Sequence, residues 1–314
     1  MAIEPCPSKT YNGPGFAIGW YSVSKSSELA VGEVKRVICF DREMALYRTR
    51  SGQAVLQDAF CPHLGAHLGV EGRVVGESIR CPFHGWRFGS DGECKEIPYC
   101  EDIPSRANIR TWHSCEINGE IMVWYHPEEL APQWDVPEIE ELNSDEWTPP
   151  RYWEFTIPNH VQNIAENTCD PEHFQYVHKM PSTPNSEITI ADDGRALTLK
   201  ADNSEADNPN TLYATMTNMG LALVRTIYAP GAEMIVYSTA QPVNLHETHM
   251  RWTLSVTKNI ADLAGDEVMQ GIKSGIFDDM PIWQHKIYRE KPLFCKGDQS
   301  LIGFRKWVKQ FYID

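Results

Sequence analysis

The sequence predicts an α+β protein, in which an all-β N-terminal domain precedes an α+β domain with an antiparallel sheet and a long C-terminal helix. Three observations lead to this prediction: short apolar runs broken by turns in the first third, an acidic and Pro-rich interruption, and a regular apolar stripe near the C-terminus. Short or alternating apolar runs indicate strands, whereas apolar residues three or four positions apart indicate a helix.

The first third of the chain has the pattern of antiparallel strands separated by Gly, Asp and Ser turns. The predicted strands lie within residues 19–23, 34–40, 45–48, 54–57 and 115–125. Residues 126–150 then contain five prolines and eight acidic residues, a composition typical of a linker. We therefore predict domains over residues 1–126 and 151–314, joined by an acidic Pro-rich linker over residues 127–150.

The second domain begins with helical spacing over residues 159–178, followed by a polar stretch over residues 181–210. Four further strands are predicted at residues 212–217, 221–228, 233–238 and 249–256. A final amphipathic helix is indicated by apolar residues that recur every three or four positions, at Ile272, Ile276, Met280, Trp283 and Ile287.

The composition narrows the class of protein. Lys and Arg number 28 and Asp and Glu 43, so the formal charge of −15 disfavours nucleic acid and anionic membranes as partners. No apolar run approaches the ~18 residues of a membrane span, and no secretory signal opens the chain. Nine scattered cysteines do not resemble a disulfide framework. We therefore expect a cytoplasmic protein with no membrane span.

A first metal-binding pattern places one cysteine and one histidine in each of two turn-rich loops, Cys61 with His63 and Cys81 with His84. A structural zinc site usually pairs its cysteines in one loop and its histidines in another. One cysteine and one histidine in each loop suit a [2Fe-2S] cluster in which two cysteines hold one iron and two histidines hold the other. This is the Rieske ligand set. Zinc remains the alternative.

The other cysteines and histidines need no metal. We interpret His67 and His113 as ordinary polar residues because the four-ligand set is already complete. The remaining cysteines are interpreted as small buried apolar residues: Cys6, Cys39, Cys94, Cys100, Cys115, Cys169 and Cys295.

The two loops resemble the Rieske family. Respiratory-type Rieske domains carry an extra cysteine in each loop, where this sequence has Ala66 and Phe83. The resemblance is therefore to the low-potential Rieske domains of oxygenases and ferredoxins.

A second pattern combines Asp170, His173 and His178 on a predicted helix. Asp170 and His173 are three apart and share a helix face, whereas His178 converges on His173 only if the helix bends or ends between them. Two imidazoles and one carboxylate form the ligand set that leaves open positions on mononuclear Fe(II). Such spacing alone is weak, and a pair of hydrogen-bonded helix histidines is the alternative.

The resemblance to Rieske oxygenases implies that the third ligand comes from the C-terminal helix, where Asp279 matches the family pattern with Ile282 and Trp283. Periodicity supports this, because Asp279 falls on the apolar stripe, where an unpaired carboxylate is costly. Asp278 falls off the stripe and is interpreted as a solvated acid. Pro281 should remove a helix hydrogen bond and kink the helix nearby.

With Asp279 as ligand, Asp170 is expected to orient His173 by a hydrogen bond to the far ring nitrogen. The resemblance further implies that Asp170 is an electron bridge to the Rieske histidine matching His84 in a neighbouring subunit, and hence a homotrimer.

The C-terminal segment resembles Rieske monooxygenases that act on steroids, of the 3-ketosteroid 9α-hydroxylase and cholesterol 7-desaturase types. The matching pieces surround Ile282-Trp283, Lys291-Pro292-Leu293 and Gln310-Phe311-Tyr312. The resemblance implies the oxygenase component of a multicomponent monooxygenase that hydroxylates a C–H bond of a bulky hydrophobic substrate with O2. It also implies a helix-grip catalytic domain.

No Gly-rich dinucleotide fingerprint follows a predicted strand, so NADH or NADPH and flavin are expected on an external reductase, with or without a ferredoxin. Apolar residues of the second-domain strands suggest a substrate pocket or simply a core: Met216, Met219, Leu221, Leu223, Val224, Met234, Ile235 and Val236. The alternatives are a desaturase or demethylase with the same metal set, a non-catalytic Rieske electron carrier, and a lipid-binding module.

Overall fold

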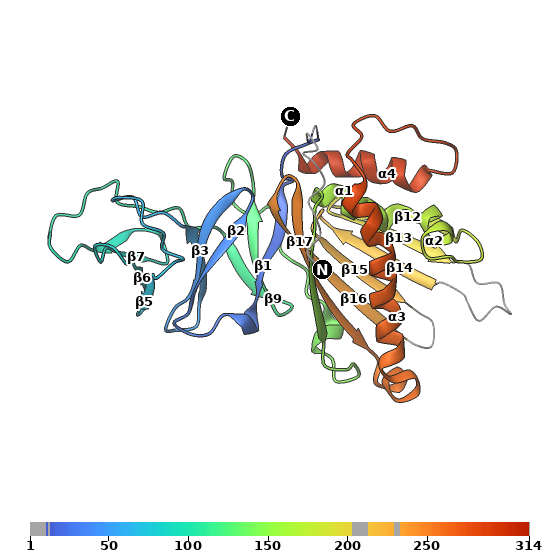
Figure 1. Cartoon of the computed structure of the whole chain (residues 1–314), viewed down its shortest axis with the longest axis horizontal. Coiled ribbons are helices and arrows are strands. Elements are labelled where there is room, and N and C mark those ends of the chain that lie inside the picture. The colour runs from blue at the N-terminus through green and yellow to red at the C-terminus, as the bar shows by residue number, and fades with distance from the viewer. Residues whose placement is uncertain (1–10, 12, 203–212, 229–232, 314) are drawn as a thin grey trace. The chain divides into compact units, whose positions relative to one another are not determined.

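The computed structural model describes residues 11, 13–202, 213–228 and 233–313, which form two compact units. One unit covers Trp20–Asp135, and the other covers Val136 onward together with the described residues before Trp20. Each unit is described by itself (Figure 1). The limits predicted from the sequence for the two functional domains, residues 1–126 and 151–314, remain a prediction.

The first unit is built from three small antiparallel sheets, with strand orders β1-β10-β9, β2-β3-β4 and β5-β6-β7-β8. Its strands are β1 (Gly19–Lys25), β2 (Val34–Cys39), β3 (Arg42–Arg48), β4 (Ala54–Asp58), β5 (Arg73–Val75), β6 (Ser78–Arg80), β7 (Arg87–Gly89), β8 (Cys94–Glu96), β9 (Ser114–Ile117) and β10 (Glu120–Tyr125). One 3-10 turn, η1 (Ser26–Glu28), follows β1. The predicted all-β character is confirmed, but strands β5 to β8 were missed because three residues are too few to show a period.

The second unit is built on a seven-stranded antiparallel sheet of order β11-β17-β16-β15-β14-β13-β12. Its strands are β11 (Arg151–Ile157), β12 (Asn185–Ile190), β13 (Ala196–Asp202), β14 (Tyr213–Met219), β15 (Leu223–Tyr228), β16 (Met234–Asn244) and β17 (Glu247–Val256). The helices are η2 (Glu140–Asn143), α1 (Val161–Ala165), η3 (Glu166–Cys169), α2 (Glu172–Tyr176), α3 (Lys258–His285), α4 (Gln299–Trp307) and η4 (Val308–Phe311). The predicted antiparallel sheet and long C-terminal helix are confirmed.

Two strands lie in the stretch that the sequence analysis described only as polar. β13 alternates in burial, with Leu197, Leu199 and Ala201 facing inward, so its period-two pattern was present in the sequence. β12 is an edge strand with no fully buried residue, and an exposed edge carries little apolar pattern.

The long helix α3 lies across one face of the seven-stranded sheet, as Figure 1 shows. Three short helices at the start of the unit, α1, η3 and α2, replace the single helix predicted over residues 159–178. The helix is interrupted between η3 and α2 because Pro171 has no N–H to donate to a continuing helix. The candidate metal ligands lie on α2, on the turn that follows it, and on α3.

Candidate metal centres and substrate pocket

The four predicted cluster ligands lie in two loops of the first unit with nearly the same backbone geometry. Cys61 follows β4 and Cys81 follows β6. The Cys61 N–H donates to the Ala66 carbonyl at 2.9 Å, and the Cys81 N–H donates to the Trp86 carbonyl at 2.8 Å. Each loop therefore closes on itself over the same number of residues.

A glycine completes each turn. The N–H of Gly65 donates to the Cys61 carbonyl at 2.9 Å, and the N–H of Gly85 donates to the Cys81 carbonyl at 3.2 Å. Their φ angles of +73° and +76° lie in the left-handed region, which glycine adopts at little cost. Both loops thus use one turn type to present a cysteine and a histidine.

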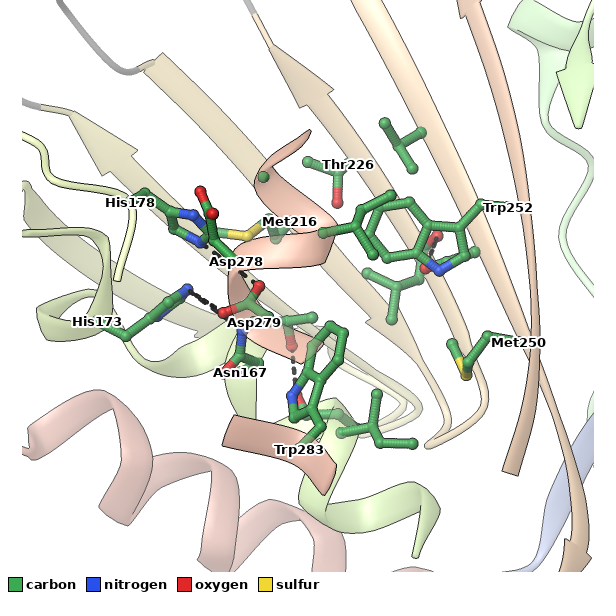
Figure 2. A pocket seen from close by; sticks show the side chains of 18 of the residues that line it. Asn167, His173, His178, Met216, Thr226, Met250, Trp252, Asp278, Asp279 and Trp283 are labelled. Atoms are coloured by element: carbon green, nitrogen blue, oxygen red, sulfur yellow. Dashed lines mark hydrogen bonds and ion pairs between the residues drawn. The ribbon is translucent and has the colours of Figure 1, made fainter. Parts of the chain in front are cut away.

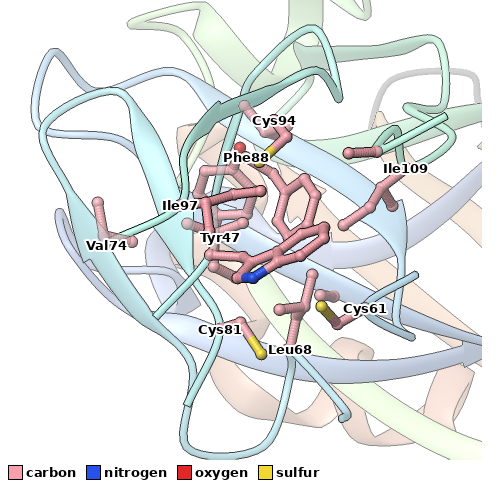
Figure 3. Packing of buried hydrophobic residues seen from close by; sticks show 14 residues of the cluster. Tyr47, Cys61, Leu68, Val74, Cys81, Phe88, Cys94, Ile97 and Ile109 are labelled. Carbon is pink, nitrogen blue, oxygen red and sulfur yellow. The ribbon is translucent and has the colours of Figure 1, made fainter. Parts of the chain in front are cut away.

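The loops bury the sulfurs and leave the imidazoles nearer to solvent. Cys61 and Cys81 belong to the apolar core cluster of the unit, where Figure 3 shows both sulfur atoms at one edge. The rings of His63 and His84 are only partly buried, and their centroids lie 4.6 Å apart. The indole of Trp86 stacks on His63 with a centroid distance of 4.7 Å and an interplanar angle of 5°. Packing alone therefore orients one imidazole.

The donor set fits a two-iron cluster better than one zinc ion. A structural zinc site usually takes its two cysteines from one loop and its two histidines from another. Here each loop gives one of each, and the four side chains divide into two sulfurs buried in the core cluster and two imidazoles nearer to solvent. Burial raises the pKa of the Cys61 thiol to about 11, so its thiolate needs a neighbouring cation. A cluster with two irons, one held by the cysteines and one by the histidines, matches this division and supplies that cation.

The remaining histidine and cysteine predictions are largely supported. His67 Nε2 lies 3.2 Å from a carboxylate oxygen of Glu43, as expected for an ordinary polar residue. Cys39, Cys94 and Cys169 are buried and Cys115 is half-buried, whereas Cys6 lies outside the described residues. Cys100 and Cys295 are exposed and lie in surface turns, so their interpretation as buried apolar residues is wrong.

The second candidate centre joins His173, His178 and Asp279, whose ligand atoms all lie within 4.8 Å of one another (Figure 2). His173 Nε2 lies 3.9 Å from Asp279 Oδ1, and His178 Nε2 lies 3.5 Å from Asp279 Oδ2. The amide of Asn167 lies 3.3 Å from His173 Nε2. Sequence reasoning missed Asn167, whose only signal was its place six residues before a candidate ligand.

The two histidines converge because α2 ends between them, as their spacing required. α2 ends at Tyr176, two residues before His178. Asp170 precedes α2 and contacts His173 Nδ1, but the contact uses the Asp170 backbone carbonyl where the sequence analysis expected its side chain. That contact leaves Nε2 as the ring atom that faces Asp279.

Asp279 reaches the histidines from the buried face of α3. Asp279 is 7% exposed, whereas Asp278 is exposed, as the helical stripe predicted. α3 continues through Pro281 to His285. The buried amide of Asn159, just before α1, donates to the carbonyls of Trp283 at 2.6 Å and Lys286 at 2.9 Å. This amide therefore ties the end of α3 to the start of α1, the first of the short helices that precede the two histidines.

Burial also sets the charge state of the centre. Desolvation lowers the pKa of His173 from its usual 6.5, which favours the neutral imidazole that binds metal. A buried carboxylate such as Asp279 is costly unless a cation or hydrogen-bond donors compensate its charge. The three residues thus fit a divalent metal, and their types fit the facial triad of non-haem iron.

A cavity of about 440 Å³ opens beside this centre, within the range of small-molecule pockets. His173, His178 and Asp279 form part of its wall. Its apolar lining comes from α1, α2 and the segment after it, α3, and the sheet with its connecting turn: Val161, Ile164, Phe174, Met180, Met216, Leu221, Val224, Met234, Val236, Met250, Trp252, Ile276 and Trp283. None of the described lining residues is Lys or Arg.

The sequence analysis predicted this pocket only in part. Met216, Leu221, Val224, Met234 and Val236 line it. Three other predicted residues, Met219, Leu223 and Ile235, are not among the lining residues, and Ile235 packs with Met219 in a separate core cluster. Successive strand residues face opposite sides of a sheet, so a run of apolar residues cannot all line one pocket.

The fold and the two centres define the class of this protein. Residues 19–109 match the Rieske [2Fe-2S] domain, and residues 123–312 match the 3-ketosteroid 9α-hydroxylase C-terminal domain. The chain belongs to this family of Rieske non-haem iron oxygenases and is an oxygenase component of the monooxygenase class. Because the match extends almost to the C-terminus, a Rieske electron carrier without a catalytic domain is not supported.

Named relatives fall into two groups. A cholesterol 7-desaturase from Xenopus laevis is 31% identical over 95% of this chain and 72% of its own length. A 3-ketosteroid-9-alpha-monooxygenase oxygenase component from Rhodococcus rhodochrous is 28% identical over 95% of this chain and 83% of its own length.

Solved structures share the fold. Dicamba monooxygenase bound to dicamba has a TM-score of 0.79 at 17% identity, covering 95% of this chain and 98% of that one. NdmB of Pseudomonas putida CBB5 has a TM-score of 0.78 at 19% identity, covering 92% of this chain and 89% of that one.

Within the described residues, no helix is long and apolar enough to cross a membrane.

Proposed function

We propose that this enzyme hydroxylates an unactivated C–H bond of a neutral, bulky, steroid-like substrate. The observation that carries the proposal is the position of His173, His178 and Asp279 in the wall of a mostly apolar cavity. Both groups of named relatives act on sterols or steroids by their names, which supports the substrate class.

The two centres are assigned as follows. Cys61, His63, Cys81 and His84 hold the [2Fe-2S] cluster, supported by the matched loops and the Rieske domain. His173, His178 and Asp279 hold mononuclear iron, which supplies the activation of dioxygen when it is bound there.

The chain's own residues position the substrate and protect the reaction. The apolar wall excludes water and places a C–H bond near the triad. Because no described lining residue is Lys or Arg, a carboxylate or phosphate in the cavity would stay uncompensated. The lining therefore favours a neutral substrate. One atom of dioxygen enters the product and the other leaves as water, so electrons must come from outside the chain.

Electron supply is assigned to an external reductase that holds NADH or NADPH and flavin, with or without a ferredoxin. We further assign Asp170 as the electron bridge to His84 of the partner subunit in a homotrimer, by resemblance to the family. The backbone contact of Asp170 with His173 supports this, because it leaves the carboxylate available for another group. A cytoplasmic location agrees with the cysteines, since no disulfide joins the eight that are described.

Desaturation of a sterol is the second candidate, because the relative from Xenopus laevis is named a cholesterol 7-desaturase. Both outcomes use the same ligands, so the products must separate them. Incubation with a surrogate reductase and a sterol and steroid panel should give a mass gain of one oxygen for hydroxylation. Loss of two hydrogens would indicate desaturation, and loss of a methyl group demethylation.

Iron content tests the assignment of the centres directly. The parent should hold about three irons per chain, two of them in a Rieske signal by electron paramagnetic resonance. Asp279→Ala should lose about one iron and keep the Rieske signal. Asp278→Ala is the matched control, since this neighbour is exposed, and should keep all the iron. If the parent holds only the cluster iron and Asp279→Ala behaves like it, the oxygenase assignment of the triad is wrong.

A further inference from the structure

Two hydroxyl groups on strand β15 line the cavity. Val224, Thr226 and Tyr228 alternate along β15 and all line the cavity, as period-two side chains on one face do. Among the described residues, neither the Thr226 hydroxyl nor the Tyr228 phenol has a hydrogen-bond partner, and neither oxygen is closed off in the wall. Figure 2 shows Thr226 between Met216 and Trp252 in that view.

Several other polar groups of the lining are already bonded within the protein or belong to the metal site. Asn167 contacts His173 Nε2 beside the triad, and the Thr168 hydroxyl donates to the Ala165 carbonyl at 2.7 Å. The Ser238 hydroxyl donates to a backbone carbonyl at 3.5 Å. The indole N–H of Trp252 also lacks a partner, but it is buried in the wall. Ser274 and Asp278 of α3 also line the cavity and are exposed. Thr226 and Tyr228 differ from the bonded groups in being open to the cavity and available, and they lie two residues apart on one strand.

The surroundings of the pair are apolar. Thr226 lies opposite Met216 on β14 and Val236 on β16, and Tyr228 lies opposite Met234. A ligand oxygen placed here would find these hydroxyls and few other donors, and a donor left unpaired beside an apolar ligand costs free energy. Burial, with a smaller contribution from the charge of Asp279, raises the pKa of Tyr228 to about 12. The phenol therefore remains a proton donor at neutral pH.

We propose that Thr226 and Tyr228 form a subsite that hydrogen-bonds a carbonyl or hydroxyl oxygen of an otherwise apolar substrate and thereby sets which carbon faces the triad. The proposal rests on the proposed function and specifies how that substrate is recognised. A smooth apolar cavity alone would let a rigid hydrocarbon skeleton slide or turn end for end. One polar anchor reduces that freedom, because only an orientation that brings a substrate oxygen to the two hydroxyls forms the hydrogen bond.

Binding by calorimetry tests the subsite without requiring turnover. The probes are 4-androstene-3,17-dione and two analogues, each lacking one of its two oxygens. We expect one analogue to bind the iron-loaded parent about 5- to 20-fold more weakly than the dione, the effect of one buried hydrogen bond. Tyr228→Phe and Thr226→Val should lower the affinity for the dione by a similar factor. Neither variant should lower the affinity for the weaker-binding analogue any further, because that analogue lacks the oxygen that these hydroxyls would bind.

A matched control uses the same chemical change on the opposite face of the sheet. Tyr237→Phe removes a phenol from β16 within the separate core cluster, and it should leave the affinity for the dione unchanged. Wherever the dione is turned over, Tyr228→Phe should also spread oxidation over more than one carbon.

Failure of the subsite and failure of the proposed function give different results. If the parent binds the dione but Tyr228→Phe and Thr226→Val bind it as tightly as the parent, the subsite is overturned and the substrate class stands. If the parent binds none of the three probes, the steroid assignment and the subsite built on it both fall.

Discussion

The two candidate metal centres are built in opposite ways. The proposed Rieske ligands lie within residues 61–84, in two loops that close on themselves by the same hydrogen bonds and each contain a left-handed glycine. The proposed iron ligands are drawn from residues 173–279, and His178 and Asp279 meet only through the packing of α3 against the rest of the second unit. The first centre is therefore a local turn structure, and the second depends on tertiary packing.

This contrast has a physical meaning. A local loop needs little chain ordering to form, so its geometry follows mainly from turn residues. A centre assembled from distant helices depends on every contact that holds those helices, such as the amide of Asn159 on the end of α3. Variants can break either centre separately.

The largest expected effect comes from removing one ligand from each centre. Cys81→Ala and His173→Ala should each lower turnover by about 10³-fold or more, because the two centres act in series. Only Cys81→Ala should also abolish the Rieske signal and lower the melting temperature of the first unit, since Cys81 belongs to its core cluster. Iron analysis, spectroscopy and thermal unfolding measure these effects, and a retained Rieske signal in Cys81→Ala would remove that ligand from the set.

Asp170→Asn should separate electron transfer from metal binding. The contact with His173 uses the Asp170 backbone, so both metals should remain. Loss of the carboxylate should lower turnover by about 10²-fold if Asp170 bridges the centres. Stopped-flow measurement of cluster reoxidation, with substrate and O2 present, should show the slow step. Reoxidation at the parent rate would exclude the bridging role.

Acid should weaken the second unit before the first. Burial lowers the pKa of His160 from 6.5 to about 4, so between these values the unfolded chain binds a proton that the folded chain does not. Stability is therefore full above pH 6.5 and falls by up to about 3 kcal/mol as the pH drops towards 4. In the first unit, Arg36 lowers the pKa of Glu43 from 4.5 to about 2, and this contribution is lost only below pH 4.5.

Hydrogen exchange followed by mass spectrometry at pH 7 and pH 5 can resolve the two units. His160→Asn retains a helix N-cap at α1 but removes the titrating ring, and should flatten the pH dependence of the second unit. His285→Asn changes an exposed histidine of the same unit that does not contribute to the pKa of His160, and serves as the control. Equal acid sensitivity of His160→Asn and the parent would show that His160 does not carry the effect.

The smallest expected effects are changes in stability, and they should differ in sign between the Cys61 loop and helix α3. Gly65→Ala places a side chain at φ +73° with no neighbouring atom within 4 Å, so only backbone strain of about 1 kcal/mol opposes it. Gly275→Ala lies within α3, and its methyl would meet His178 Nδ1 at 3.9 Å, an ordinary contact. It should gain about 0.5–1 kcal/mol of helix stability. Thermal unfolding compares the two, and stabilisation by Gly65→Ala would contradict the left-handed turn.

Residue spacing predicted several features of the proposed centres. The spacing of Cys61, His63, Cys81 and His84 predicted the cluster loops, because ligands on tight turns are close in sequence as well as in space. The helical stripe distinguished Asp279 from Asp278, since one side of a surface helix must be apolar. The spacing of His173 and His178 also required that the helix end between them, and α2 does.

Other features depended on contacts between residues that are distant in sequence. Periodicity could not show that Asp279 meets His178, that Asn159 ties α3 to the short helices, or that the Asp170 backbone contacts His173. Nor could it separate Val236, which lines the cavity, from Ile235, which packs elsewhere, until the strand register was known. The sequence by itself determined which residues could bind metal, because ligand chemistry and turn preference are local properties. Only the tertiary structure decided which of them share a cavity, because that depends on how strands pair and helices pack across more than a hundred residues.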